Sequence, residues 1–160
     1  ARLSEPEDRV GLVQNLLEAH GDFDPRAFHQ APFARFLGLL GGKPPEEPEP
    51  PVRAFNAALW GVCTQSEPEV GLGCMGAVES AFADASAAIG AAVVARGWVD
   101  GRHLVHYSLH AAIDKRHARE LWEPLGRRAP ERQELGRQGM LLGEFLLDRL
   151  YRDFSFFRAP

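Results

Sequence analysis

The stretch HLVHYSLHAAIDKRH, residues 103–117, holds four of the six histidines of this chain. It ends in the pattern His110-x-x-x-Asp114-x-x-His117. Each residue of an α-helix turns by about 100°, so positions i, i+4 and i+7 lie within roughly 60° of one another. Two imidazoles and one carboxylate are therefore expected on one helix face. Helical bundles present ligands to an interior metal in this way.

The ligand types narrow the choice of metal. Imidazole and carboxylate together suit iron, manganese or zinc, and the absence of thiolates argues against structural zinc. The ordinary alternative is a set of core histidines bonded to backbone, but each buried imidazole would then need its own partner. For His103 and His106 a solvated or internally hydrogen-bonded role is the default, with contact to the ligands or substrate as the alternative. Tyr107 is expected to pack rather than to support radical chemistry.

Glu79 is the second informative residue. It lies in the stretch CMGAVESAF, residues 74–82, where its neighbours are apolar or small. A helix that is apolar nearly all round is buried, and a buried carboxylate needs a cation, a metal or an arginine as partner. Glu79 is therefore a further candidate ligand, with a salt bridge to an arginine as the alternative.

The remaining sequence predicts one all-α domain over residues 1–160, because no segment shows sustained strand alternation. Ser4 and Glu7 form a capping-box pattern before a first helix. Asp24-Pro25 is a second helix start, and the apolar stretch from Val70 to Arg96 predicts a long core helix. The Pro- and Glu-rich run at 41–51 predicts an extended connection. Pro124 is expected to end the histidine-bearing helix.

Charge and cysteine content limit the partners and the compartment. The net charge is −4 and the pI is near 5.9, so we expect no nucleic-acid partner. Cys63 and Cys74 lack CxxC spacing and are interpreted as buried free thiols, which fits the reducing cytosol. Glu79 and Asp84 within the long apolar stretch argue against a membrane span.

The order of motifs resembles that of the haem-oxygenase-like diiron oxidases, often called iron-containing redox enzymes. Their fold is shared with thiaminase-like proteins and pyrroloquinoline-quinone synthase. The resemblance covers about Asp8 to Phe154 and rests on residues 15–18 (Asn-Leu-Leu-Glu), Gly21, His29, Glu79 and the pattern His110-x-x-x-Asp114-x-x-His117. It implies a seven-helix-type bundle that holds two irons with three histidines and three carboxylates.

Carried over by position, the resemblance implies that His29, Glu79, His110, Asp114 and His117 are metal ligands. The sixth ligand of the family is a glutamate nine or ten residues before His29, where this chain has His20 and Ala19 with Glu18 next to them. Glu18 and His20 are therefore the two alternatives for that position. The family also carries helices before this region, so we expect an upstream part beyond Ala1.

The resemblance implies an enzyme that uses two Fe(II) ions and O2 to N-oxygenate, desaturate or cleave an amino-acid-like or fatty-acid-like small molecule. One alternative is a non-catalytic or degenerate relative that binds a metal or small ligand. Another is a cofactorless oxidase or thiaminase-like hydrolase, which in the thiaminase-like case needs an activated cysteine. No membrane partner is expected, and a homodimer remains open beside a monomer.

Overall fold

A computed structural model describes the backbone of residues 2–28 and 30–157, and their side chains except at Pro25 and 155–157. These residues form six α-helices and three short 3-10 helices, and no strand. The α-helices are α1 (Glu7–Ala19), α2 (Gln30–Leu39), α3 (Pro50–Gln65), α4 (Pro68–Ala95), α5 (Val105–Gly126) and α6 (Pro130–Phe157). The 3-10 helices are η1 (Gly21–Phe23), η2 (Pro25–Ala27) and η3 (Gly101–His103). The all-α prediction is confirmed.

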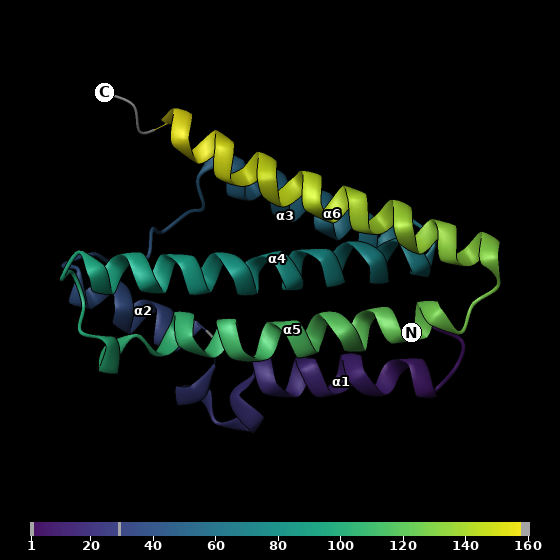
Figure 1. The fold of residues 1–160 in the computed structure, drawn as a ribbon, viewed down its shortest axis with the longest axis horizontal. Helices are drawn as coiled ribbons and strands as arrows, with labels where there is room; N and C mark the ends of the chain where they lie inside the picture. Colours follow the sequence, from purple (N-terminus) through teal and green to yellow (C-terminus); the bar gives the residue numbers. More distant parts are fainter. Residues whose placement is uncertain (1, 29, 158–160) are drawn as a thin grey trace.

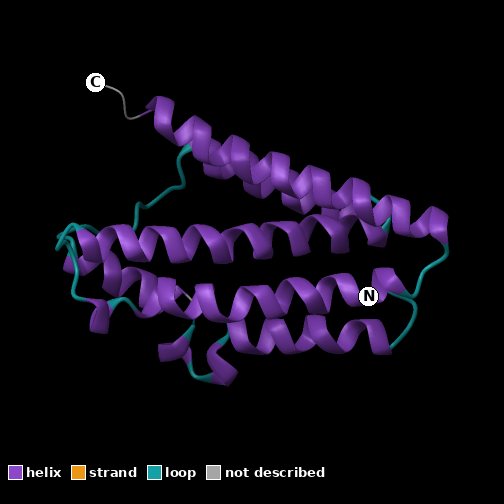
Figure 2. Ribbon diagram, viewed as in Figure 1, coloured by secondary structure: helices purple, strands orange, loops and turns teal. Residues whose placement is uncertain are grey.

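Helix α4 is the centre of the bundle (Figure 1). It packs along α5 on one side and along α6 on the other, while α1 lies on the far side of α5. Helix α3 lies beside α6, and α2 packs against the beginning of α5. Figure 2 shows that loops are confined to the ends of the helices and to the connection between α2 and α3. A site between α1, α4 and α5 is therefore formed by helix faces rather than by loops.

Small residues allow α4 and α6 to approach closely. A Cβ atom at Gly73 would collide with the backbone of Gly136, and one at Gly139 would collide with the carbonyl of Val70. A Cβ atom at Gly143 would likewise meet the α4 backbone. The glycines of both helices thus set the spacing of the central pair.

Among the described helices, α4 alone is long and apolar enough to span a membrane. In this structure its faces pack against neighbouring helices.

A network of charged side chains joins α1, α4 and α6 to the segment between α5 and α6, at the opposite end of α4 from η3. Asp8 of α1 is 2% exposed and accepts hydrogen bonds from Arg127 (2.8 Å) and from Arg128. Arg128 also donates to Glu69 of α4 (3.3 Å), which accepts a further bond from Arg132 of α6 (3.2 Å). Buried carboxylates need such partners because an unpaired charge is costly in the interior. The network fixes the start of α1 against the bundle.

Two local predictions about helix ends are wrong. The N-cap of α1 is Pro6 without a side-chain cap, and Ser4 donates to Glu5 (3.1 Å) instead of forming a capping box. Helix α5 begins at Val105, after η3, and continues through Pro124 to Gly126. Pro124 lies in the last turn, where its ring removes only one hydrogen bond, and Leu125 beyond it is buried in the core.

The two cysteines differ in burial, and the Pro- and Glu-rich run connects α2 to α3. Cys74 is completely buried, as predicted, whereas Cys63 is exposed, which corrects the interpretation of both as buried thiols. Cys63 lies at the open edge of a cavity that also contacts Gly71 and Met75 of α4. Residues 40–49 form the predicted non-helical connection, and Pro50 and Pro51 open α3.

A glycine-to-alanine pair tests the close packing of α4 and α6. Gly139→Ala should lower the free energy of unfolding by about 1–3 kcal/mol, because the added methyl group meets the α4 backbone. Gly61→Ala is the matched control, since nothing lies near its Cβ position and helix propensity should stabilise it by up to about 1 kcal/mol. Denaturant unfolding measures both. Equal effects of the two substitutions would contradict this packing.

The Asp8 network predicts a pH-dependent contribution to stability. Burial opposes ionisation of Asp8, but hydrogen bonds from Arg127 and Arg128 outweigh it and lower the pKa of the carboxyl. The stabilisation is therefore present above the unfolded value of 3.8 and is lost as the pH falls through the folded pKa.

Asp8→Asn should accordingly cost roughly 1.5–3 kcal/mol at neutral pH, the range for hydrogen bonds to charged groups, and little in acid. Unfolding curves at both pH values measure this difference. Asp148→Asn, at an exposed ion pair with Arg152, should change stability by less than about 1 kcal/mol. A cost at Asp8 that did not shrink in acid would show that the carboxylate charge is not responsible.

Candidate metal centre

The candidate ligands come from three helices. Helix α5 supplies His110, Asp114 and His117, which share the face that packs against α4. Helix α4 contributes Glu79, one turn after Met75 on the same face. Helix α1 contributes Glu18 from its last turn. The regular helical spacing of these positions directs their side chains to one region between the helices.

Three of the side chains converge closely. The candidate ligand atoms of Glu79, Asp114 and His117 all lie within 4.8 Å of one another. Nδ1 of His117 is 3.8 Å from Oε2 of Glu79 and 3.8 Å from Oδ1 of Asp114. Asp114 is only 1% exposed, and His117 is also buried. Two carboxylates and an imidazole at this separation can surround one cation.

His110 completes the α5 part of the cluster. Its Nδ1 is 2.9 Å from Oδ2 of Asp114, one turn along the helix. The rings of Phe82 and His106 lie 5.1 and 4.5 Å from the His110 ring. His106 in turn packs on Phe33 at 5.0 Å. Aromatic neighbours thus fix the orientation of His110 and shield this side of the cluster from water.

Glu18 reaches the cluster from α1. Its Oε2 is 2.9 Å from Nε2 of His117 and accepts a hydrogen bond from Arg116 at 2.6 Å. His20, the other candidate for this position, is exposed, and its Nδ1 lies 2.8 Å from the carbonyl of Leu16. The structure therefore brings Glu18, and not His20, to the predicted ligands.

The other predicted residues lie as follows. His103 is exposed in η3, apart from the cluster. Tyr107 packs edge-on against Phe36 at 5.0 Å in a second apolar cluster, which agrees with a packing role. His29 lies outside the residues that the structure describes; α2 begins at the next position, Gln30.

The electrostatics of the cluster separate its two glutamates. Burial, together with the charge of Asp114, raises the pKa of Glu79 to about 7. Hydrogen bonds from Arg116 and then from His117 lower the pKa of Glu18 to about 2. Glu18 is therefore ionised at neutral pH, whereas Glu79 of the metal-free protein takes up a proton at a pH well above its ordinary range.

This donor set fits a metal ion. Glu18, Glu79 and Asp114 would bring three negative charges into a largely buried region, and the pKa of Glu79 is raised first by burial and then by the charge of Asp114. A divalent cation removes that repulsion, and carboxylate with imidazole is a ligand set that suits iron. The structure brings Glu79, Asp114 and His117 together as a group that could hold a metal ion, with Glu18 at hydrogen-bond distance from His117 and His110 at hydrogen-bond distance from Asp114.

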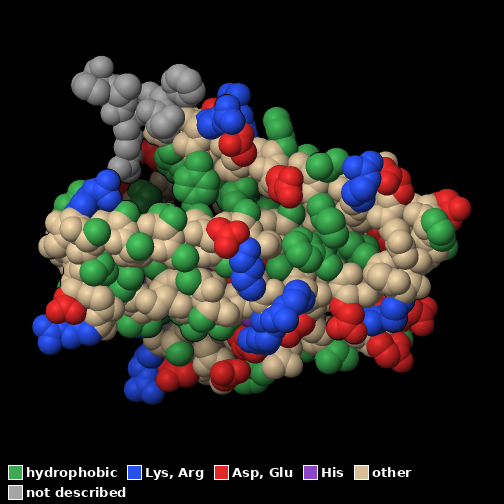
Figure 3. All heavy atoms as spheres, in the orientation of Figure 1, with side chains coloured by type: hydrophobic (Ala, Val, Ile, Leu, Met, Phe, Trp, Pro, Cys, Tyr) green, Lys and Arg blue, Asp and Glu red, His purple; other side chains and the backbone are tan. Residues whose placement is uncertain are grey.

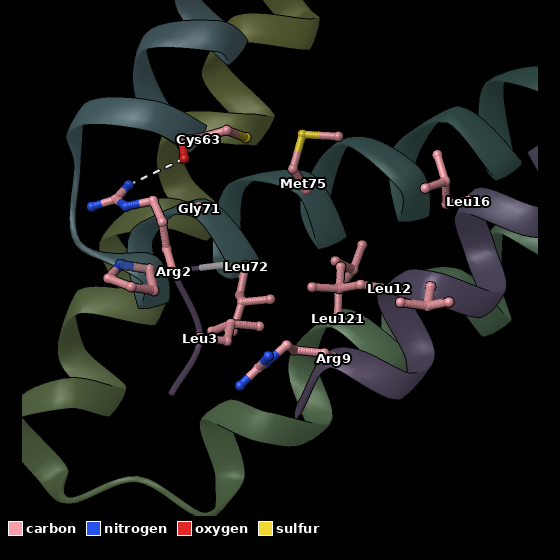
Figure 4. A pocket seen from close by; sticks show the side chains of 12 residues that line it. Arg2, Leu3, Arg9, Leu12, Leu16, Cys63, Gly71, Leu72, Met75 and Leu121 are labelled. Atoms are coloured by element: carbon pink, nitrogen blue, oxygen red, sulfur yellow. Dashed lines mark hydrogen bonds between the residues drawn. The ribbon is translucent and has the colours of Figure 1, made fainter. Parts of the chain in front are cut away.

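An open cavity of about 350 Å³ lies one helical turn from the cluster, lined by residues of α1, α3, α4 and α5 and of the segment before α1. Figure 4 shows Leu12, Leu72, Met75 and Leu121 among the side chains that line it. Met75 precedes Glu79 by one turn of α4 and Leu121 follows His117 by one turn of α5, so the cavity and the cluster are consecutive along both helices. Its other lining residues include Arg2 and Arg9.

The sequence did not predict this cavity or the hydrogen bond from Arg116 to Glu18. Arg116 precedes a predicted ligand and has Glu120 four residues later, which predicts a pair within the helix. Its contact with Glu18, 98 positions away in the chain, had no local signal. The cavity brings together residues of α1, α3, α4 and α5 and of the segment before α1, so no periodicity within one helix could reveal it.

Comparison with known families agrees with the fold and the donor set. A sequence model of the family described as iron-containing redox enzymes, with the haem-oxygenase-like fold, matches residues 1–144. The chain belongs to this family of iron-containing redox enzymes. Neither curated proteins nor solved structures give a match, so the family match and the site geometry carry the functional argument.

The raised pKa of Glu79 predicts how metal affinity depends on pH. A metal must displace the proton from this carboxyl, so Fe(II) or Co(II) affinity should fall as the pH is lowered through about 7. Calorimetric titration at pH values on either side of this point measures the effect. Glu79→Gln should bind more weakly at all pH values.

In the metal-free protein, Glu79 should make the stability fall as the pH rises, which is the opposite of the dependence expected for metal affinity. Since the folded pKa of Glu79 is about 7 and its ordinary value is 4.5, stability should fall as the pH rises between them and level off above. Glu79→Gln should remove that contribution. If wild type and Glu79→Gln showed the same change of stability with pH between 4.5 and 7, the environment assigned to Glu79 would be wrong.

Proposed function

We propose that this protein is a non-haem diiron oxidase or oxygenase that uses O2 to oxidise a small molecule. The observation that supports it best is the convergence of Glu79, Asp114 and His117 within 4.8 Å, with Glu18 at hydrogen-bond distance from His117. In a family of iron-containing redox enzymes, this cluster is the natural place for the iron.

Each residue has a definite part in the proposal. Glu18, Glu79, His110, Asp114 and His117 would hold two Fe(II) ions, and His29 would be the remaining ligand. When bound, ferrous iron supplies the electrons and the coordination positions for activating O2. The aromatic rings of Phe82 and His106 keep water from one side of His110. A dry site suits an enzyme that must prevent the loss of reactive species to solvent.

The cavity beside the cluster indicates the kind of substrate. Its lining is mainly aliphatic, and its polar side chains are Arg2, which donates to the carbonyl of Cys63 (3.1 Å), and Arg9. A small molecule with an apolar body and an acidic group complements such a surface. Among the substrate types expected from the family resemblance, these features favour a fatty-acid-like molecule over an amino-acid-like one.

A non-catalytic metal-binding protein is the second candidate. The positions nine and ten residues before His29, where the family has its glutamate, hold His20 and Ala19, so the sixth ligand departs from the family spacing. Binding of one iron without O2 consumption would favour this candidate. Iron-dependent O2 consumption would favour the oxidase.

Substitution of two α5 ligands tests the proposed function. Asp114→Ala and His117→Ala should each abolish iron-dependent O2 consumption and reduce bound iron. Their helicity should stay close to wild type, because the fold rests on the apolar packing of α4, α5 and α6. An oxygen electrode, iron analysis and circular dichroism provide the three measurements.

Asp148→Ala on the exposed side of α6 is the matched control and should leave all three unchanged. If Asp114→Ala kept its full iron content, the cluster would not be the iron site. If Asp114→Ala unfolded the protein, the buried carboxylate would be a structural partner of His110 rather than a ligand.

A further inference from the structure

Arg116 connects α5 to the ligand on α1. It immediately precedes His117, yet its guanidinium lies against α1, where Nη2 donates to Oε2 of Glu18 at 2.6 Å. Nη1 donates to Oε1 of Glu120, one turn later on α5, at 3.1 Å. The two ends of one planar group therefore hold one carboxylate from each helix. A guanidinium fixes such an arrangement better than an ammonium group, because its donors have a rigid geometry.

Arg116 is itself held in place. With its amide oriented by its partners, Asn15 of α1 donates to Oε2 of Glu120 at 2.6 Å and to the carbonyl of Gly11. Glu120 thus contacts α1 through one oxygen and Arg116 through the other. The chain of contacts Asn15–Glu120–Arg116–Glu18 begins and ends on α1, and it fixes the rotation of this helix at the cluster.

Glu18 needs such support. It lies in the last turn of α1, and its side chain is 22% exposed. An unrestrained glutamate would lose side-chain entropy on binding a metal, on the order of 1–2 kcal/mol. Its remaining polar contact outside the cluster is a longer bond from Gln14 at 3.3 Å. Arg116 therefore makes the strongest contact that orients Glu18 toward His117.

We propose that Arg116 is a positioning residue that holds Glu18 as a metal ligand and so sets the affinity of the metal position that Glu18 serves. This inference rests on the proposed function. It commits to a direction: loss of Arg116 weakens metal binding although it removes a positive charge.

The charges around Arg116 explain why its loss should weaken metal binding. Arg116 lies between two carboxylates, Glu18 and Glu120, so the three groups together carry one negative charge. The guanidinium is largely neutralised by these partners and is 36% exposed, so solvent screens its repulsion of a metal further. The contribution of Arg116 to the geometry of Glu18 therefore outweighs its charge. Hydrogen-bond partners of metal ligands commonly contribute about 10–100-fold to affinity.

The test is anaerobic titration with Co(II), whose visible absorption reports the ligand geometry, followed by Fe(II). Arg116→Gln should weaken one metal position by about 10–100-fold and change the cobalt spectrum. Arg116→Lys keeps the charge but loses the planar group whose two nitrogens reach both Glu18 and Glu120, so it should restore only part of the affinity. Arg119→Gln is the matched control, because Arg119 is exposed and donates to the backbone carbonyl of Lys115, and it should bind as wild type does.

A double substitution separates positioning from a general effect on the fold. In Glu18→Ala, the further change Arg116→Gln should cost no additional affinity, because Arg116 acts through Glu18. Glu120→Gln loosens the support of Arg116 without touching Glu18 and should weaken binding to a smaller extent. Thermal unfolding checks that each variant folds. If Arg116→Gln does not fold, Glu120→Gln and Arg116→Lys provide the same test.

The outcomes separate the two proposals. Wild-type protein that binds neither Co(II) nor Fe(II) overturns the proposed function and, with it, the role of Arg116. Wild-type binding with unchanged or stronger binding in Arg116→Gln overturns the role of Arg116 alone. Equal losses from Arg116→Gln in the presence and absence of Glu18 would also overturn it, because the effect would then pass through another residue.

Discussion

A carboxylate buried between helices must be compensated, and this constraint at Asp114 governs the centre of the molecule. Asp114 is 1% exposed, with His110 on one side and His117 on the other. Glu79 faces the same point from α4, where repulsion from Asp114 adds to the effect of burial on its pKa. The two carboxylates and the imidazoles therefore form a set that a cation completes. The α4–α5 packing is needed to keep them together.

Arginine side chains hold helix α1 near both of its ends. Asp8 is held by Arg127 and Arg128 near the start of the helix, and Glu18 is held by Arg116 near its end. Charged contacts thus set the position of α1 along α5. In Figure 3, charged side chains of both signs lie over the lower edge, where α1 and α5 lie, and also along α6, while apolar ones gather over the junction of α4 and α6.

The sequence predicted the parts of the site that follow from helical periodicity. The spacing of His110, Asp114 and His117 predicted one helix face, and the structure places Asp114 next to both histidines. The apolar surroundings of Glu79 predicted burial in the long central helix, but its side chain is 29% exposed. The choice between Glu18 and His20 could not be made from spacing. It depends on the strained turn after α1, where Asp22 and Phe23 both have positive φ, and on the tertiary contact with Arg116. The capping box at Ser4 and the break at Pro124 failed because tertiary packing outweighed local preference.

The central claim is that iron binds where Glu18, Glu79, Asp114 and His117 meet. A crystal structure of protein loaded anaerobically with Fe(II), with anomalous data collected at the iron edge, tests it most directly. The account predicts anomalous peaks within about 2.0–2.2 Å of the nitrogen and oxygen atoms of these residues, distances usual for such ligands. It also predicts that Arg116 stays hydrogen-bonded to Glu18. Iron bound elsewhere, or a cluster that retains the direct contact between Glu18 and His117 at full iron loading, would contradict it.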